Sequence, residues 1–300
     1  MPELPPQHIA RPYEQPSRQA TYRAQLLMPD GAAIATWLFE LPKDSPVKTN
    51  SATVPGAPIL MLHGNGEEHG IFGPLIDAAV ACGRRVIAID SRAQGLSTRG
   101  SAALSYELMA NDVLHVLEAL HIDQVHVLGF SDGAIEGLLL ARDHAKHVCS
   151  LTAIGANLSP EGLVGTDEIE QAARANTAWA KRKEEGPAHY PDGSCAPSRK
   201  QATINAELLH LMVVEPHIAA TSLSAIACPT TIIAGALDDI PLAQTDQIAS
   251  AIVGAREVIV ADADHNLPKV APEAILRELL VTIATAEATA PFCPSSPQDI

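Results

Sequence analysis

The class of fold is indicated most directly by Val127-Leu128-Gly129-Phe130-Ser131-Asp132-Gly133-Ala134. This stretch is a G-x-S-x-G pattern that follows an apolar run and opens a helical one. A serine on so sharp a strand-to-helix turn takes a strained backbone conformation, so the residues two before and two after it must be small. Both are glycine here, Gly129 and Gly133. The helix N-terminus then offers backbone N–H groups to a developing oxyanion, and the pattern predicts Ser131 as a nucleophile.

Short apolar runs alternate with helical patterns along most of the chain. The apolar runs lie at 59–62, 86–89, 125–128, 151–154, 231–234 and 258–260. Segments with apolar residues at three- and four-residue spacing lie between them, at 74–82, 105–120, 133–145, 242–253 and 271–284. Strands buried on both faces and separated by helices are typical of a parallel sheet built from βαβ units. The sequence therefore predicts an α/β protein with a mostly parallel central sheet flanked by helices.

Two departures from this alternation predict the rest of the architecture. Pro29-Asp30-Gly31 is a turn signal between two strand-like runs, which predicts an antiparallel strand pair near the amino terminus. No strand-like run occurs between Ile154 and Thr230, and an insertion of this length after the sixth predicted strand is typical of a lid. The predicted organisation is a flexible segment at 1–19, an α/β core at 20–154 and 228–285, a helical cap at 155–227 and a flexible tail at 286–300.

Composition limits the partners and the compartment. Apolar residues make up 47% of the 300 residues and charged residues 18%, which suits a sizeable core and not a disordered chain. The net charge of −15 argues against nucleic acid or an anionic membrane surface as a partner. No apolar run approaches the roughly 20 residues of a membrane span, and the Pro-rich start does not resemble a secretory signal. Five scattered cysteines without a CxxC pair favour a reducing compartment, so we expect a cytoplasmic protein.

A serine nucleophile needs a base, and the base needs an acid that orients it. Both residue types appear later in the chain, each directly after an apolar run. Gly235-Ala236-Leu237-Asp238 follows one run, and Asp264-His265 follows the next. The carboxyl ends of parallel strands open onto one crevice, so the three loops can deliver their side chains to one place. The sequence therefore predicts a catalytic triad of Ser131, Asp238 and His265.

The residues and their order resemble the α/β-hydrolase fold family, whose triad also runs Ser, Asp, His along the chain. His63-Gly64-Asn65-Gly66 ends the first parallel strand run, where the family has its HGxG motif. The resemblance implies an oxyanion hole formed by the backbone N–H groups of Asn65 and Asp132. His63 and Gly64 are expected to be structural parts of this loop, with His63 holding it through side-chain hydrogen bonds.

Two further features refine the resemblance. The loop Asp-Ser-Arg-Ala-Gln-Gly-Leu-Ser at 90–97 resembles the family's D-x-R-G-x-G-x-S motif, with Ala93 where glycine is usual. This departure predicts a slightly different loop packing and leaves the triad intact. Dehalogenases and epoxide hydrolases of this fold use an aspartate at the position of Ser131. Serine instead implies acyl transfer through an acyl-enzyme, which water hydrolyses with His265 as base.

Neighbouring carboxylates leave the identity of the acid open to alternatives. Asp239 lies beside Asp238 and could replace it, although the G-x-x-D spacing favours Asp238. Asp262 and Asp264 lie close to His265 in the chain and are further alternatives, although both suit loop and turn positions.

The expected substrate follows from acyl-transfer chemistry and from charge. Glu67, Glu68, Asp132 and Asp239 lie near the predicted mouth of the crevice and disfavour anionic acyl groups. We therefore expect hydrolysis of small to medium, uncharged carboxylic esters, with a small-molecule ester as partner and a homodimer left open. Another bond (C–C, lactone, amide or thioester) and a non-catalytic binding protein on the same fold are the alternatives. No cofactor and no metal are expected, since serine, histidine and backbone amides suffice for this chemistry.

Overall fold

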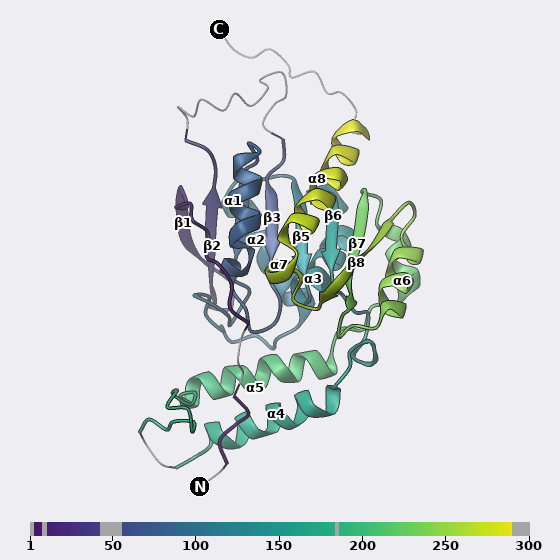
Figure 1. The fold of residues 1–300 in the computed structure, drawn as a ribbon. Coiled ribbons are helices and arrows are strands. Elements are labelled where there is room, and N and C mark those ends of the chain that lie inside the picture. Colours follow the sequence, from purple (N-terminus) through teal and green to yellow (C-terminus); the bar gives the residue numbers. More distant parts are fainter. Residues whose placement is uncertain (1–2, 8–10, 43–55, 184–185, 290–300) are drawn as a thin grey trace.

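A single mixed sheet forms the centre of the protein. The computed structural model describes residues 3–7, 11–42, 56–183 and 186–289 (Figure 1). Within these ranges eight strands form one sheet in the order β1-β2-β4-β3-β5-β6-β7-β8. The pairs β1–β2 and β2–β4 are antiparallel and all others are parallel, which confirms the predicted fold class. The strands are β1 (Tyr22–Leu27), β2 (Ala33–Phe39), β3 (Ile59–Leu62), β4 (Val86–Ile89), β5 (Val125–Phe130), β6 (Val148–Ile154), β7 (Thr230–Leu237) and β8 (Arg256–Asp264).

The central strands are buried on both faces, which explains their sequences. Every residue of β3, β4 and β5 is buried, so these strands are apolar along their length except for His126 and do not alternate between apolar and polar residues. β8 lies at the edge of the sheet and exposes much of its length. The sequence indicated only Val258–Val260 of this strand, because charged and small residues flank that run.

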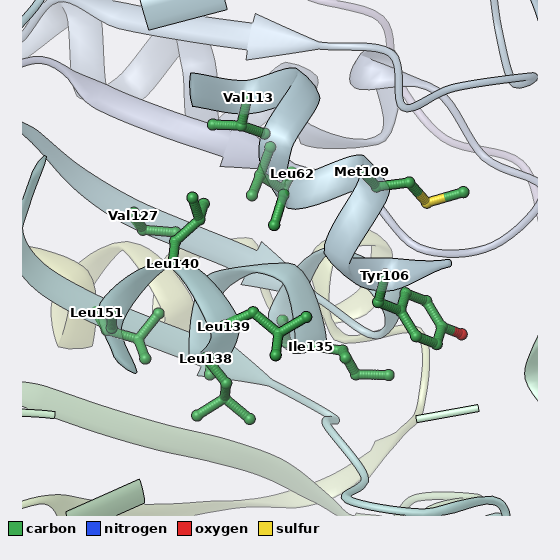
Figure 2. Packing of buried hydrophobic residues seen from close by; sticks show 14 of the residues in the cluster. Leu62, Tyr106, Met109, Val113, Val127, Ile135, Leu138, Leu139, Leu140 and Leu151 are labelled. Carbon is green, nitrogen blue, oxygen red and sulfur yellow. The ribbon is translucent and has the colours of Figure 1, made fainter. Parts of the chain in front are cut away.

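Helices cover both faces of the sheet (Figure 1). Apolar side chains of α1, α7 and α8 pack on one face, and those of α2, α3 and α6 pack on the other. Figure 2 shows the second cluster, in which Leu62, Val127 and Leu151 from three neighbouring strands meet side chains of α2 and α3. The helices are α1 (Gly73–Ala81), α2 (Tyr106–Ala119), α3 (Asp132–Asp143), α6 (Leu242–Ala251), α7 (Leu267–Val270) and α8 (Pro272–Thr289).

The insertion between β6 and β7 contains two long helices beyond one end of the sheet (Figure 1). α4 (Thr166–Ala180) and α5 (Arg199–Val214) pack against each other. Trp179 of α4 is buried, and its indole N–H donates a hydrogen bond of 2.9 Å to the carbonyl of Pro197. This tryptophan therefore stabilises the interior of the insertion. Below we call α4, α5 and the loops between β6 and β7 the cap.

The two ends of the chain pack on the core over more of their length than the sequence indicates. α8 continues to Thr289, four residues beyond the predicted core limit at 285, because Ala286 is buried and Glu287 pairs with Arg84. The rest of the predicted tail lies outside the described residues.

No helix within the described ranges is long and apolar enough to cross a bilayer.

The amino-terminal segment also makes specific contacts where it is described. Backbone N–H groups of Ser17 and Arg18 donate to the carboxylate of Asp77 on α1. The side chain of Gln7 donates to Asp192 in the cap at 2.9 Å. The flexibility expected of 1–19 stays a prediction, but this segment contacts both the core and the cap.

Candidate active site

Ser131 lies on a strained turn between β5 and α3. Its backbone has φ 52° and ψ −117°, which places a non-glycine residue at positive φ. The flanking glycines permit this turn because there is no room for a side chain. A Cβ at Gly129 would lie 2.2 Å from the carbonyl oxygen of Gly133, and a Cβ at Gly133 would lie 2.2 Å from that of Leu62. The small residues demanded by the sequence pattern are thus explained by backbone contact.

The structure brings the three predicted triad residues together at the carboxyl ends of their strands. Nε2 of His265 lies 3.1 Å from Oγ of Ser131, and Nδ1 of His265 lies 2.7 Å from Oδ1 of Asp238. The Asp238 side chain is fully buried, and the backbone N–H of Ile240 donates to it at 2.8 Å. The carboxylate is thereby fixed, so it can hold His265 with its proton on Nδ1 and its Nε2 free to accept the serine proton.

The alternative acids have other surroundings. Asp239 is exposed and lies on the wall of a cavity. Asp264 pairs with Arg11 and accepts the backbone N–H of Asn266 at 2.9 Å. Asp262 is exposed and has φ 57°. Among the described residues, Asp238 alone makes a carboxylate hydrogen bond to the ring of His265.

The predicted oxyanion donors belong to two segments that meet at the nucleophile, since a Cβ at Gly64 would lie 3.0 Å from Cβ of Ser131. Asn65 is in the loop after β3, and Asp132 is the first residue of α3. Among the described residues, no backbone hydrogen bond in a turn, in a loop or at a helix end uses the backbone N–H of Asn65 or Asp132. Neither N–H group is thus used by another backbone acceptor, which is a requirement for an oxyanion hole, and their role as donors stays a prediction.

A side-chain network behind these donors was not foreseen from the sequence. The amide of Asn65 donates to Oδ2 of Asp132 at 2.9 Å and to the carbonyl of Leu208 in the cap at 3.2 Å. The hydroxyl of Tyr106 donates to Oδ1 of Asp132 at 2.9 Å. Burial raises the pKa of the Asp132 carboxyl to about 6, while these two donors act in the opposite direction. The network connects the loop after β3, the start of α3 and the cap.

His63 lies in a position that suits a structural role. It is fully buried, and burial lowers its pKa. Its Nε2 accepts the backbone N–H of Ser91 at 2.9 Å, so Nδ1 carries the proton and donates to the carbonyl of Gly64 at 2.8 Å. A neutral His63 thus links the oxyanion loop to the loop after β4. In that second loop Ala93 has φ 67°, the left-handed conformation that glycine adopts without strain, which gives a reason why glycine is usual there.

A cavity of about 180 Å³ opens beside Ser131 and His265. Core loops supply some of its lining residues and the cap supplies others. Three carboxylates, those of Asp132, Glu215 and Asp239, lie on its wall. Glu215 is not among the site residues that the sequence predicts. The remaining lining residues are Tyr106, Asn157, Leu163, Val164, Ile169, Met212 and Ile240.

Two acidic residues expected at the mouth are engaged elsewhere. Glu67 forms an ion pair with Lys269, and Glu68 accepts hydrogen bonds from Tyr13 and Gln15. Neither lines the cavity. Their charge therefore contributes less to the selection of substrate than that of Asp132 and Asp239.

One group in the described part of the chain could bring three ligand atoms around an ion, namely Glu68, His69 and Asp90. The same atoms already have protein partners. Oδ1 of Asp90 accepts both the backbone N–H and Nδ1 of His69, and Glu68 accepts the Tyr13 hydroxyl. This arrangement is explained by hydrogen bonds that join the segment after β3 to the loop after β4 and to the amino-terminal segment.

Glu136 is a buried glutamate on α3 that the sequence did not single out. It lies one helical turn after Asp132 on α3 and is almost completely buried. The Ser91 hydroxyl donates a hydrogen bond of 3.3 Å to its carboxyl. Burial, together with the charges of Asp132 and Asp112, raises its pKa well above the usual range. Burial therefore favours the protonated form of Glu136.

The raised pKa of Glu136 predicts a pH-dependent stability. The folded state binds this proton more tightly than the unfolded chain, so its contribution to stability falls as pH rises from the unfolded pKa of 4.5 through the folded pKa. Glu136→Gln cannot lose a proton, and we expect its Tm to fall less between pH 5 and pH 8 than that of the wild type. The exposed Glu257→Gln is the control and should keep the wild-type slope. Thermal unfolding at the two pH values measures this, and equal slopes for all three proteins would contradict the assignment.

The sheet order, the strained serine turn between β5 and α3, and the Ser–His–Asp hydrogen-bond chain together define an α/β-hydrolase fold. Part of the chain is also similar in sequence to the α/β-hydrolase family. The family model described as alpha/beta hydrolase fold matches residues 57–184.

Individual relatives place the chain among several hydrolases. A Variovorax paradoxus protein whose name describes a carbamate hydrolase is 33% identical over 106 residues, 35% of this chain and 40% of the relative. The chain thus matches less than half the length of that relative. The 3-oxoadipate enol-lactonase 1 of Acinetobacter baylyi is 26% identical over 73% of this chain and 86% of its own length. The solved structure of a Pseudomonas aeruginosa hydrolase has a TM-score of 0.66 at 21% identity, covering 88% of this chain and 99% of that one, which shows the shared fold.

Proposed function

We propose that this protein is a serine hydrolase that cleaves a small to medium, uncharged carboxylic ester through an acyl-enzyme on Ser131. The observation that carries the proposal is the continuous hydrogen-bond chain from Ser131 through His265 to the buried Asp238. A serine hydroxyl on such a chain can lose its proton as it attacks a carbonyl carbon, which an isolated serine does not do efficiently near neutral pH.

The proposed reaction has two halves that use the same groups. In acylation, Oγ of Ser131 attacks the ester carbonyl while Nε2 of His265 takes the hydroxyl proton, and the backbone N–H groups of Asn65 and Asp132 stabilise the oxyanion. The tetrahedral intermediate collapses as His265 returns the proton to the leaving alcohol. In deacylation, His265 takes a proton from water, the hydroxide attacks the acyl carbonyl, and Ser131 leaves with the proton restored.

The cavity supports a small, uncharged acyl group. Its volume of about 180 Å³ is small for a ligand site. Asp132, Glu215 and Asp239 on its wall would repel an anionic substrate, and no lysine or arginine is among the described residues that line it.

A lactone is the alternative substrate that the relatives favour. One relative over most of the chain is named an enol-lactonase, and a lactone is a cyclic carboxylic ester that the same triad can open. A carbamate, a thioester or an amide requires the same acyl-transfer steps with a different leaving group. A C–C bond or a role in binding without catalysis lacks a specific observation in its favour.

Hydrolysis of matched esters tests the substrate proposal. We expect p-nitrophenyl acetate and butyrate to be better substrates than the octanoate, which exceeds the cavity. We also expect p-nitrophenyl hexanoate to have a kcat/KM about tenfold higher than the hydrogen adipate ester of equal length, since repulsion of about 1.4 kcal/mol corresponds to that ratio. The difference should shrink in 0.5 M salt, because salt screens the wall carboxylates.

The Ser131→Ala variant supplies the background rate for every ester in this series. Equal rates for the hexanoate and adipate esters at low salt would contradict the charge argument. A cyclic lactone of similar size, measured beside the butyrate ester, decides between the open-chain and cyclic substrates.

A further inference from the structure

A buried ion pair connects the loop of the oxyanion donor to the loop of the catalytic base. Glu67 lies in the turn that carries Asn65, since its backbone N–H donates to the carbonyl of Gly64 at 3.3 Å. Lys269 lies in α7, four residues after His265. Nζ of Lys269 and Oε1 of Glu67 are 2.5 Å apart, and only 1% of the lysine side chain and 13% of the glutamate side chain are exposed. The pair therefore joins two catalytic loops that are about 200 residues apart in the sequence.

A lysine in this position is not explained by stability alone. Removing an ammonium group from water costs several kcal/mol, and a buried ion pair is often no better for stability than apolar residues of similar size. The pair is instead suited to fixing geometry, because an unpaired Lys269 or Glu67 would have no favourable alternative position in the interior.

The amino-terminal segment covers this ion pair from outside. The ring of Tyr13 lies 5.4 Å from Nζ of Lys269, and its hydroxyl donates to Glu68 at 2.8 Å. Gln15 donates to the same glutamate oxygen at 2.7 Å. The same segment also contacts the chain next to the base, because Arg11 pairs with Asp264, the residue before His265. Residues 11–15 thus touch both loops.

We propose that Glu67 and Lys269, covered by Tyr13, are positioning residues that hold the oxyanion loop in register with His265. They form a clamp that touches neither the nucleophile nor the cavity wall. Its effect is on the transition state, in which the oxyanion donors and the base must act on the same tetrahedral centre. A displacement of about 1 Å between such groups can cost roughly a hundredfold in rate. The proposal rests on the triad chemistry of the proposed function.

Lys269→Met and Glu67→Gln test the clamp. We expect each to lower kcat for p-nitrophenyl butyrate about 10- to 100-fold while KM changes less than about threefold, since ground-state binding in the cavity is unaffected. Lys269→Arg, which retains the charge, should recover a substantial part of the loss. Arg84→Met is the matched control, because it breaks an ion pair between Arg84 and Glu287 that is remote from the site, and it should leave kcat unchanged.

A second readout separates the clamp from the substrate proposal. The rate at which a fluorophosphonate labels Ser131 depends on the triad and the oxyanion hole, whatever the natural substrate. If the wild type labels rapidly but hydrolyses no ester, the ester proposal fails, and the labelling rates of the same variants still test the clamp.

If Lys269→Met and Glu67→Gln lower Tm but retain the wild-type kcat and labelling rate, the ion pair is only structural. The proposal that it positions the catalytic groups is then wrong. Should either variant fail to fold, Tyr13→Ala tests the same contact from the partly exposed side. It is expected to lower kcat and the labelling rate with little change in KM, and wild-type values for both would overturn the proposal.

Discussion

Ser131→Ala is expected to lower kcat for p-nitrophenyl butyrate by about 10⁴- to 10⁶-fold, the scale for loss of a triad nucleophile. The hydroxyl of Ser131 lies 3.1 Å from Nε2 of His265, and no other hydroxyl of the described residues is bonded to that nitrogen. Alanine can keep the backbone turn and the neighbouring N–H groups. The remaining activity should therefore approach the rate supported by the oxyanion hole and binding alone.

Two measurements make this result decisive. The variant should fold with a Tm near that of the wild type, and it should no longer react with a fluorophosphonate. Ser159→Ala removes a serine at the start of the cap and should retain both activity and labelling. Substantial turnover by Ser131→Ala would show that another group carries the reaction.

Much of the fold could be predicted because the central strands are buried on both faces. The runs at 59–62 and 86–89 coincide with β3 and β4, since every residue there contacts the core. β8 was recognised only in part, because an exposed edge strand tolerates Arg256, Glu257 and Asp262 and loses its apolar signature. The cap region is indicated in the sequence by the absence of strand signals between Ile154 and Thr230, and the structure places the helices α4 and α5 in this interval.

The candidate triad could be located because each member follows a strand, and parallel strands end at one edge. The contacts that surround it could not. Lys269 meets Glu67, and Tyr106 meets Asp132, across long intervals of sequence without any periodic pattern. Such pairs depend on the three-dimensional position of loops and on which polar groups remain to be satisfied after the core has formed.

Asp238→Asn should lower kcat by about 10⁴-fold, the scale for loss of the orienting acid in such a triad. An asparagine keeps the size of the side chain but can present an N–H group to Nδ1 of His265. The imidazole would then carry its proton on Nε2, where it could no longer accept the proton of Ser131. The Asn variant should accordingly show a loss in kcat with a smaller change in KM, measured on the same butyrate ester.

Asp239→Asn is the matched control because it makes the same chemical change one residue along the chain. Asp239 is exposed on the cavity wall and has no bond to His265, so this variant should change kcat by less than about threefold. It should also raise the relative rate of the adipate ester, since it removes one repelling charge. Comparison of the two variants thus separates the orientation of His265 from the electrostatic repulsion of the substrate. A large kcat loss in Asp239→Asn with little effect in Asp238→Asn would transfer the role of the acid to Asp239 and contradict the geometry of the 2.7 Å contact.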